Sequence, residues 1–126
     1  MKSNLIVLTL SIMFICIIGQ VSILPWWTFV IPVCVLGAIY AYNGWKISAF
    51  PAGVLAGFLV WSGGELYYDI MGKGLVLDSI AQLIGVPKIV AIAAAGILGG
   101  LLNGTALLAG YTAFSGATSR TAENEQ

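Results

Sequence analysis

Residues 89–114 read IVAIAAAGILGGLLNGTALLAGYTAF, and this stretch decides the fold class of the chain. It carries no charged residue. It is also longer than the roughly 20 apolar residues that a helix needs to cross a bilayer core about 30 Å thick. A charge-free run of this length predicts a transmembrane helix. We therefore interpret the rest of the chain around this segment.

Small residues recur along the segment at helical spacing. Gly96, Gly100 and Gly104 follow one another at intervals of four, so they lie on one face of a helix. Two overlapping GxxxG patterns of this kind allow a neighbouring helix backbone to approach closely. Asn103 flanks the glycines, and its amide needs a partner in lipid, where an unpaired polar group is costly. We expect all four residues to pack against another helix, with Asn103 hydrogen-bonded across the interface.

The composition places the whole chain in the membrane class. Of its 126 residues, 60% are hydrophobic and 8% are charged, whereas a soluble domain carries about 25% charged residues. The formal net charge is zero, so the chain lacks the basic surface that nucleic acid binding needs. Histidine, the commonest metal ligand and general base, is absent. We expect no catalytic residue, no metal site, no cofactor and no nucleic acid partner.

The sequence predicts an all-α membrane protein with four transmembrane helices. The predicted spans lie at about residues 4–24, 26–42, 49–68 and 89–113. Pro25 begins the first turn, and Trp26 and Trp27 mark a membrane–water interface. The short connections predict antiparallel neighbours in an up-down four-helix bundle. A signal peptide is the alternative for the first segment, although it lacks a cleavage site with small residues.

The third segment has a small-residue face of its own. Gly53 and Gly57 form a further GxxxG pattern within residues 49–68. We therefore expect this segment and residues 89–113 to form a tightly packed antiparallel pair.

A short amphipathic helix is predicted at about residues 77–84, between the third and fourth spans. Its apolar residues follow helical spacing, whereas Asp78, Ser79 and Gln82 face away from them. Ser79 and Gln82 also have the spacing of a capping box at a helix start. Because the segment is too short to span a bilayer, we expect it to lie flat in the membrane interface.

The loop charges set the expected orientation of this single membrane domain, residues 1–114. Four spans place both termini and Lys46 on one side, and Lys73 and Lys88 on the other. The first side carries more positive charge, which favours cytoplasmic N and C termini. Because the charge difference is small, an inverted or mixed topology stays open. Residues 115–126 are expected to be a polar, flexible tail.

Glu65 is the only acidic residue well inside a predicted span, and Asp69 follows it on the same helix face. Ser62 lies one turn before Glu65, and Gln20 is predicted at a similar depth. An intramembrane carboxylate is a candidate functional site, and two nearby carboxylates can hold a proton near neutral pH. The alternative is that both carboxylates reach the membrane surface and pair with Lys73.

A set of glycines and interface aromatic residues carries a resemblance to a known family. The set comprises Pro25-Trp26-Trp27, Ala49-Phe50, Gly53, Gly57, Phe58, Trp61, Ile80-Ala81, Gly99-Gly100 and Gly104. Over its second to fourth segments the chain resembles a family of small uncharacterised bacterial four-span integral membrane proteins. The resemblance implies the four-span fold and a location in the bacterial cytoplasmic (inner) membrane, and it brings no activity. Fluoride channels of the Fluc type and small multidrug exporters fit less well, because an early Gly-rich stretch with an arginine and a first-span glutamate are missing.

Two functions are consistent with these features. The first is a non-enzymatic accessory or scaffold subunit, or a self-associating membrane component, that acts through its glycine-lined helix faces. Its partners would be the lipid bilayer and either copies of itself, in a homo-oligomer, or a larger membrane complex. The second is a small ion or solute transporter or channel that uses the polar site at Glu65 and Asp69. An intramembrane enzyme is the weakest interpretation, because the sequence shows no nucleophile–base pair.

Overall fold

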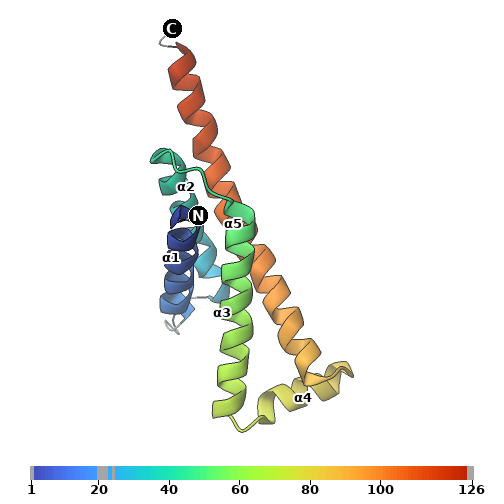
Figure 1. Ribbon diagram of the computed structural model, residues 1–126. Helices are drawn as coiled ribbons and strands as arrows, with labels where there is room; N and C mark the ends of the chain where they lie inside the picture. Colours follow the sequence, from blue (N-terminus) through green and yellow to red (C-terminus); the bar gives the residue numbers. More distant parts are fainter. Residues whose placement is uncertain (1, 20–22, 24, 125–126) are drawn as a thin grey trace.

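The computed structural model describes residues 2–19, 23 and 25–124, and the protein is all-helical. Helix accounts for 87% of the structure, and no strand occurs in the described residues. The elements in order are α1 (Lys2–Gly19), the 3-10 helix η1 (Trp26–Phe29), α2 (Val30–Tyr42), α3 (Ala49–Met71), α4 (Leu75–Ile84) and α5 (Lys88–Asn124). In Figure 1, α1, α2, α3 and α5 run along one another, and α4 connects the separated ends of α3 and α5.

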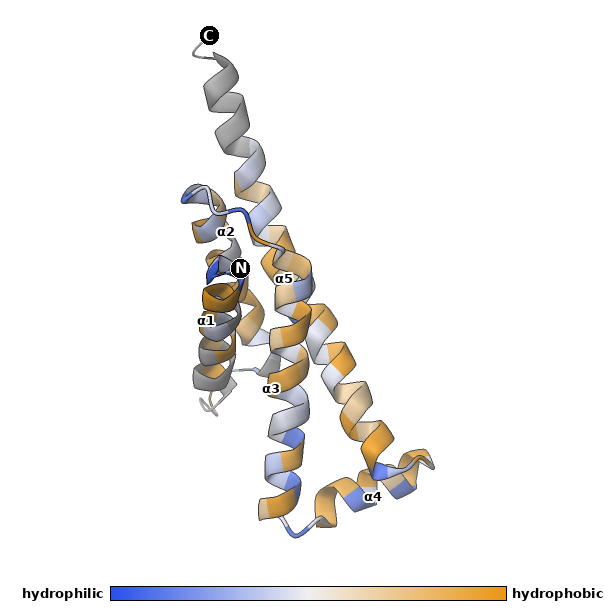
Figure 2. Cartoon of the chain, viewed as in Figure 1, coloured by the Kyte–Doolittle hydropathy of each residue, from blue (hydrophilic) through white to orange (hydrophobic). Residues whose placement is uncertain are grey.

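Two helices in the described part of the chain are long and apolar enough to cross a membrane. They are α3, over Ala49–Met71, and the portion of α5 over Lys88–Gly116. Hydrophobic residues cover much of both helices, whereas hydrophilic residues gather near α4 and in the loop between α2 and α3 (Figure 2). By length and composition, these helices support the predicted membrane class.

Prolines and glycines set several of the helix ends, and Pro25 begins the first turn as predicted. Pro25 precedes η1, and its carbonyl accepts the backbone N–H of Thr28 at 3.0 Å. Pro51 lies in the first turn of α3, where a helix has no use for the missing N–H. At the end of α2, the Asn43 amide donates to the Ile39 carbonyl at 2.9 Å, and Gly44 takes a φ of 68°. A positive φ favours glycine, so Gly44 suits this turn.

The short amphipathic helix begins earlier than residues 77–84 and does not use the predicted cap. α4 follows Gly74, which has a φ of 77°, and ends at Gly85, which has a φ of 75°. Ser79 lies inside α4, where its hydroxyl donates to the Leu75 carbonyl at 2.7 Å. The capping-box prediction for Ser79 was therefore wrong, because the left-handed Gly74 had already started the helix.

Both ends of the chain differ from the predicted boundaries. α1 ends at Gly19, whereas the first span was expected to reach residue 24, and residues 20–22 and 24 lie outside the described residues. At the other end, α5 continues to Asn124, so residues 115–124 of the expected tail have helical backbone. No proline interrupts this sequence, and each residue added to an existing helix gains a hydrogen bond.

The hydrophobic core lies where α1, α2, α3 and α5 meet. Its buried residues are Val7, Phe29, Val33, Leu36, Tyr40, Ala49, Ala106 and Leu107. Near one end of this core, Asn4 Oδ1 accepts the backbone N–H of Ser48 at 3.2 Å. The Tyr111 hydroxyl donates to the Trp45 carbonyl at 2.9 Å. These two bonds tie the loop between α2 and α3 to both α1 and α5.

Candidate functional site

The glycines predicted to pack helices lie where α3 and α5 contact each other. A Cβ added to Gly57 would lie 2.6 Å from the Gly99 carbonyl oxygen and 2.8 Å from the Gly100 Cα. These distances leave no room for a side chain at Gly57.

The remaining predicted glycines make the same kind of contact along α3 and α5. A Cβ on Gly53 would lie 2.7 Å from the Gly104 Cα. One on Gly100 would lie 2.8 Å from the Val54 carbonyl oxygen. Gly96 faces the side chains of Phe58 and Ser62. These glycines are therefore covered by other parts of the same chain.

Asn103 is fully buried at this helix crossing. Its Nδ2 donates to the Gly53 carbonyl at 2.6 Å, while its Oδ1 has no hydrogen-bond partner among the described groups. Asn103 thus links α5 to α3, which is the interhelical role expected for a buried amide.

A second tight helix crossing, between α2 and α5, escaped the sequence reasoning. A Cβ on Gly37 would overlap the Leu107 carbonyl and lie 2.8 Å from the Tyr111 N. A Cβ on Gly110 would overlap the Cys34 carbonyl. The signal was visible as a further glycine near the end of residues 89–114, but Gly110 does not continue the four-residue spacing of Gly96, Gly100 and Gly104. It therefore serves a different neighbour on another face of α5.

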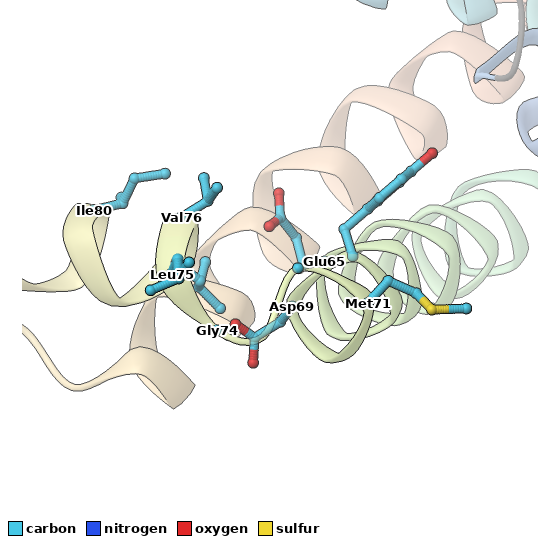
Figure 3. Close-up of a pocket in the computed structure, with 10 residues that line it drawn as sticks. Glu65, Asp69, Met71, Gly74, Leu75, Val76 and Ile80 are labelled. Atoms are coloured by element: carbon cyan, nitrogen blue, oxygen red, sulfur yellow. The ribbon is translucent and has the colours of Figure 1, made fainter.

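The two candidate carboxylates share an open hollow between the end of α3 and the start of α4. The hollow has a volume of about 520 Å³. Its α3 wall carries Glu65 and Asp69, and its α4 wall carries Leu75, Val76 and Ile80 (Figure 3). One wall is therefore acidic and the other apolar. The prediction that Glu65 and Asp69 lie together agrees with this geometry.

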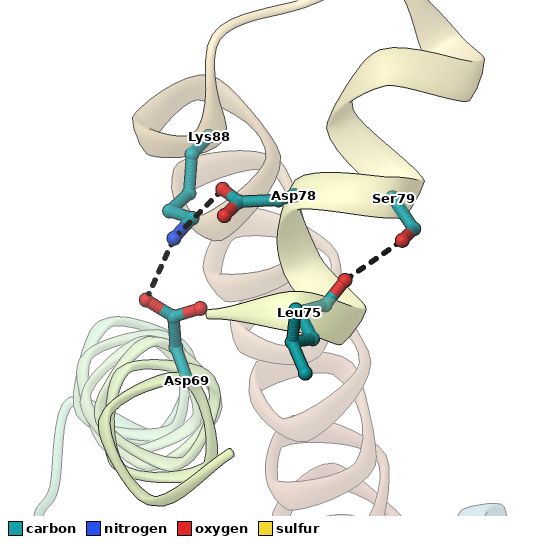
Figure 4. Close-up of polar contacts among 5 residues, drawn as sticks. All are labelled: Asp69, Leu75, Asp78, Ser79 and Lys88. Carbon is teal, nitrogen blue, oxygen red and sulfur yellow. Dashed lines mark hydrogen bonds and ion pairs between the residues drawn. The ribbon is translucent and has the colours of Figure 1, made fainter. Parts of the chain in front are cut away.

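Asp69 forms an ion pair that the sequence did not suggest. Lys88 Nζ lies 3.1 Å from Asp69 Oδ2 and 2.9 Å from Asp78 Oδ1, so one ammonium joins α3, α4 and α5 (Figure 4). The sequence offered Lys73 as the partner of Asp69, but no described ion pair involves Lys73. Lys73 has a φ of 55° in the turn after α3, and the chain then folds back to bring Lys88 to Asp69. The contact of Asp69 with Lys88 depends on this tertiary turn.

Of the other residues predicted for the polar site, the structure describes only Ser62, which does not line the hollow. Ser62 faces α5 at Gly96, and its buried hydroxyl has no hydrogen-bond partner among the described groups. Gln20 lies outside the described residues. Among the described residues, the polar site therefore consists of Glu65 and Asp69, with Lys88 bound to Asp69.

The two carboxylates of the hollow differ in their burial and in their charged neighbours. Asp69 is largely buried, with a side chain 13% exposed, and it has Lys88 as its counter-charge. No described hydrogen bond or ion pair holds Glu65. An acidic, partly open hollow beside an apolar wall can attract cations or exchange protons with water. Among the described residues, no group of three or more His, Cys, Asp or Glu side chains is placed to hold a metal ion.

Comparison with known proteins identified no relative. No protein-family model matches the chain, and neither a curated protein nor a solved structure matches it significantly.

Proposed function

We propose that this protein is a four-span scaffold or accessory subunit of the bacterial cytoplasmic membrane, without enzymatic activity. The observation that carries the proposal is that large apolar side chains point outward from every α-helix. Examples are Leu5, Ile31, Val35, Leu55, Leu59, Leu83, Ile97 and Leu98. Contiguous apolar surface on this scale is rare on soluble monomers, whereas lipid tails solvate it readily. The resemblance to small four-span bacterial proteins belongs to the same proposal.

Helix lengths support four spans, although in the described part of the chain only α3 and α5 are each long and apolar enough to cross a membrane. The 18 residues of α1 extend for about 27 Å at 1.5 Å per residue. The 4 residues of η1 and the 13 of α2 together extend for about 28 Å at 2.0 and 1.5 Å per residue. Both lengths are close to the bilayer core of about 30 Å.

The surface of α4 supports an interfacial position. Leu77 and Ala81 are buried against the rest of the protein. Val76, Ile80 and Leu83 are exposed, and Leu83 reaches 88% exposure. These three residues adjoin the buried ones around the helix, while Ser79 and Gln82 lie on the opposite side. Such an apolar face is suited to the headgroup–acyl boundary.

Two glycines of α3 that no other part of the protein covers support the proposal that a partner helix packs against α3. The glycine faces of α3 and α5 cover each other, so they cannot serve an external partner in this arrangement. Gly63 and Gly64 differ, because a Cβ added to either would have no atom within 4 Å. Each glycine inside a helix costs about 1 kcal/mol relative to alanine. Close packing of another membrane helix at Gly63 and Gly64 would explain why α3 has glycine at these positions.

Purification in a mild detergent tests the scaffold proposal. We expect the wild-type protein to elute as a homo-oligomer or with another membrane protein, as measured by light scattering and mass spectrometry. Gly63→Leu should remove that association, because leucine would keep a partner backbone at a distance. Ala94→Leu is the matched control, since Ala94 is also an exposed small residue in a helix. A monomeric wild-type protein without companions would contradict the proposal.

A second function, transport of protons or small cations, is favoured by one observation. The hollow beside α4 holds Glu65 without a described counter-charge and faces the end of the span rather than its middle. Flux across liposomes that contain the purified protein separates this function from the scaffold function.

A further inference from the structure

The connection between α3 and α5 has a sharp turn on each side of α4. The turn before α4 has two consecutive residues of positive φ, Lys73 at 55° and Gly74 at 77°. The turn after α4 has Gly85 at 75°. α4 is therefore a short rigid rod between two sharp turns.

Few side chains hold α4 against the rest of the protein. Of its 10 residues, only Leu77 and Ala81 are buried. The apolar residues Val76, Ile80 and Leu83 are exposed, and Leu83 reaches 88% exposure. Packing alone is thus a weak anchor for this helix.

One charged side chain supplies the connection that packing does not. The Lys88 ammonium, at the start of α5, binds Asp69 on α3 and Asp78 on α4 (Figure 4). Gly74 makes room for this arrangement, since a Cβ there would lie 3.1 Å from Lys88 Nζ and 3.2 Å from Asp78 Oδ2. Removal of the ammonium would leave two carboxylates facing each other, which repel.

The geometry points to an ion-pair lock: Lys88 holds α4 closed as a lid beside the hollow of Glu65 and Asp69, and loss of either ion pair frees α4 to swing. Asp69 belongs to both the lock and the hollow wall. Its Oδ2 binds Lys88, while its Oδ1 is buried without a described partner. When the Lys88–Asp69 pair breaks, Asp69 loses its counter-charge and the α4 wall of the hollow is released from α3.

Hydrogen–deuterium exchange of the full-length protein in nanodiscs tests the lock. We expect Lys88→Gln and Asp78→Asn each to accelerate amide exchange in residues 75–84 by about fivefold or more, or about 1 kcal/mol at 1.4 kcal/mol per tenfold change. Lys73→Gln is the matched control, because it removes a lysine that lies in the turn before α4 and has no described ion pair. Exchange around Gly53 and Gly104 should stay unchanged in all variants.

A charge-swap double variant tests whether α4 is held by the opposite charges at positions 78 and 88 or by the shapes of these side chains. Asp78→Lys combined with Lys88→Asp again places one ammonium near two carboxylates, and it should restore slow exchange in residues 75–84. Unchanged exchange in Lys88→Gln would overturn the lock, as would equal acceleration in Lys73→Gln. Acceleration that extends to Gly53, or a swap that fails to restore protection, would also overturn it. None of these outcomes depends on whether the protein is a scaffold or a transporter.

Discussion

Asn103 donates a 2.6 Å hydrogen bond to the backbone carbonyl of Gly53, and this bond joins α5 to α3 where glycine leaves no side chain between them. A larger residue at position 53 would collide with Gly104 and push Asn103 away from this carbonyl. The amide and the glycines therefore act together. The glycines permit close approach of the two backbones, and Asn103 fixes the helices at one register.

Replacement of Asn103 by alanine should destabilise the folded protein. It removes the interhelical bond, and such bonds in membrane proteins contribute about 0.6 kcal/mol on average and up to about 1.7 kcal/mol. Because Asn103 is fully buried, we expect a loss near the upper value. Unfolding in mixed detergent micelles measures it. Thr105→Ala is the control, since the Thr105 hydroxyl is exposed and bonds only to carbonyls of its own helix. Equal stability of the two variants would contradict the register role of Asn103.

Gly57→Ala should cost more stability than Gly63→Ala, although both make the same change in the same helix. An added methyl group at Gly57 meets the backbone of Gly99 and Gly100, and overpacking of this kind costs about 1–3 kcal/mol. The methyl group at Gly63 meets nothing within 4 Å, so the higher helix propensity of alanine should stabilise α3 by up to about 1 kcal/mol. Thermal unfolding in detergent compares them. A Gly57→Ala protein as stable as Gly63→Ala would show that α3 and α5 do not touch at Gly57.

The α3–α5 pair could be predicted because its signal is periodic. Glycines at intervals of four define a helix face without knowledge of the partner, and Asn103 adds a polar group that must be satisfied. The helix starts and stops at Pro25, Gly44 and Gly85 are likewise local, since backbone conformation there depends on one or two residues.

The Lys88 contacts could not be predicted, because they are neither periodic nor local in the sequence. They depend on how the turn at Lys73 and Gly74 directs α4, and a non-glycine residue with positive φ has no clear sequence signal. The α2–α5 crossing at Gly37 and Gly110 was missed for a similar reason. Each helix contributes one glycine to this crossing, so neither sequence shows a repeat there. Only the folded arrangement brings Gly37 and Gly110 to the same helix crossing.

Reporter fusions should place both the C-terminus and the loop at Lys46 in the cytoplasm, and a fusion near Lys73 on the opposite side. The hydrogen bond between Asn4 and Ser48 places the start of α1 beside the start of α3. Four spans then bring both termini to one side, where the larger positive charge favours the cytoplasm. Alkaline phosphatase and fluorescent-protein fusions report the two sides. A cytoplasmic Lys73 reporter would reject the four-span arrangement.

Glu65→Gln separates the scaffold function from the transport function. In a proton or cation path, the Glu65 carboxyl must be reached from water and must change charge during the cycle, which glutamine cannot do. Liposomes with the wild-type protein would then show flux, and Glu65→Gln would abolish it without unfolding the protein. In the scaffold function, the wild-type liposomes show no protein-dependent flux. We expect the scaffold outcome.

Lys73→Gln is the control for this experiment, because it removes a charge near the hollow at a residue that neither lines the hollow nor forms a described ion pair. If transport occurs through the hollow, Lys73→Gln should retain flux while Glu65→Gln loses it. If the protein is a scaffold, Glu65→Gln should change stability by no more than about 1 kcal/mol, as expected for a partly exposed side chain without a described partner. A robust flux that Glu65→Gln abolishes at unchanged thermal stability would replace the scaffold proposal with the transporter.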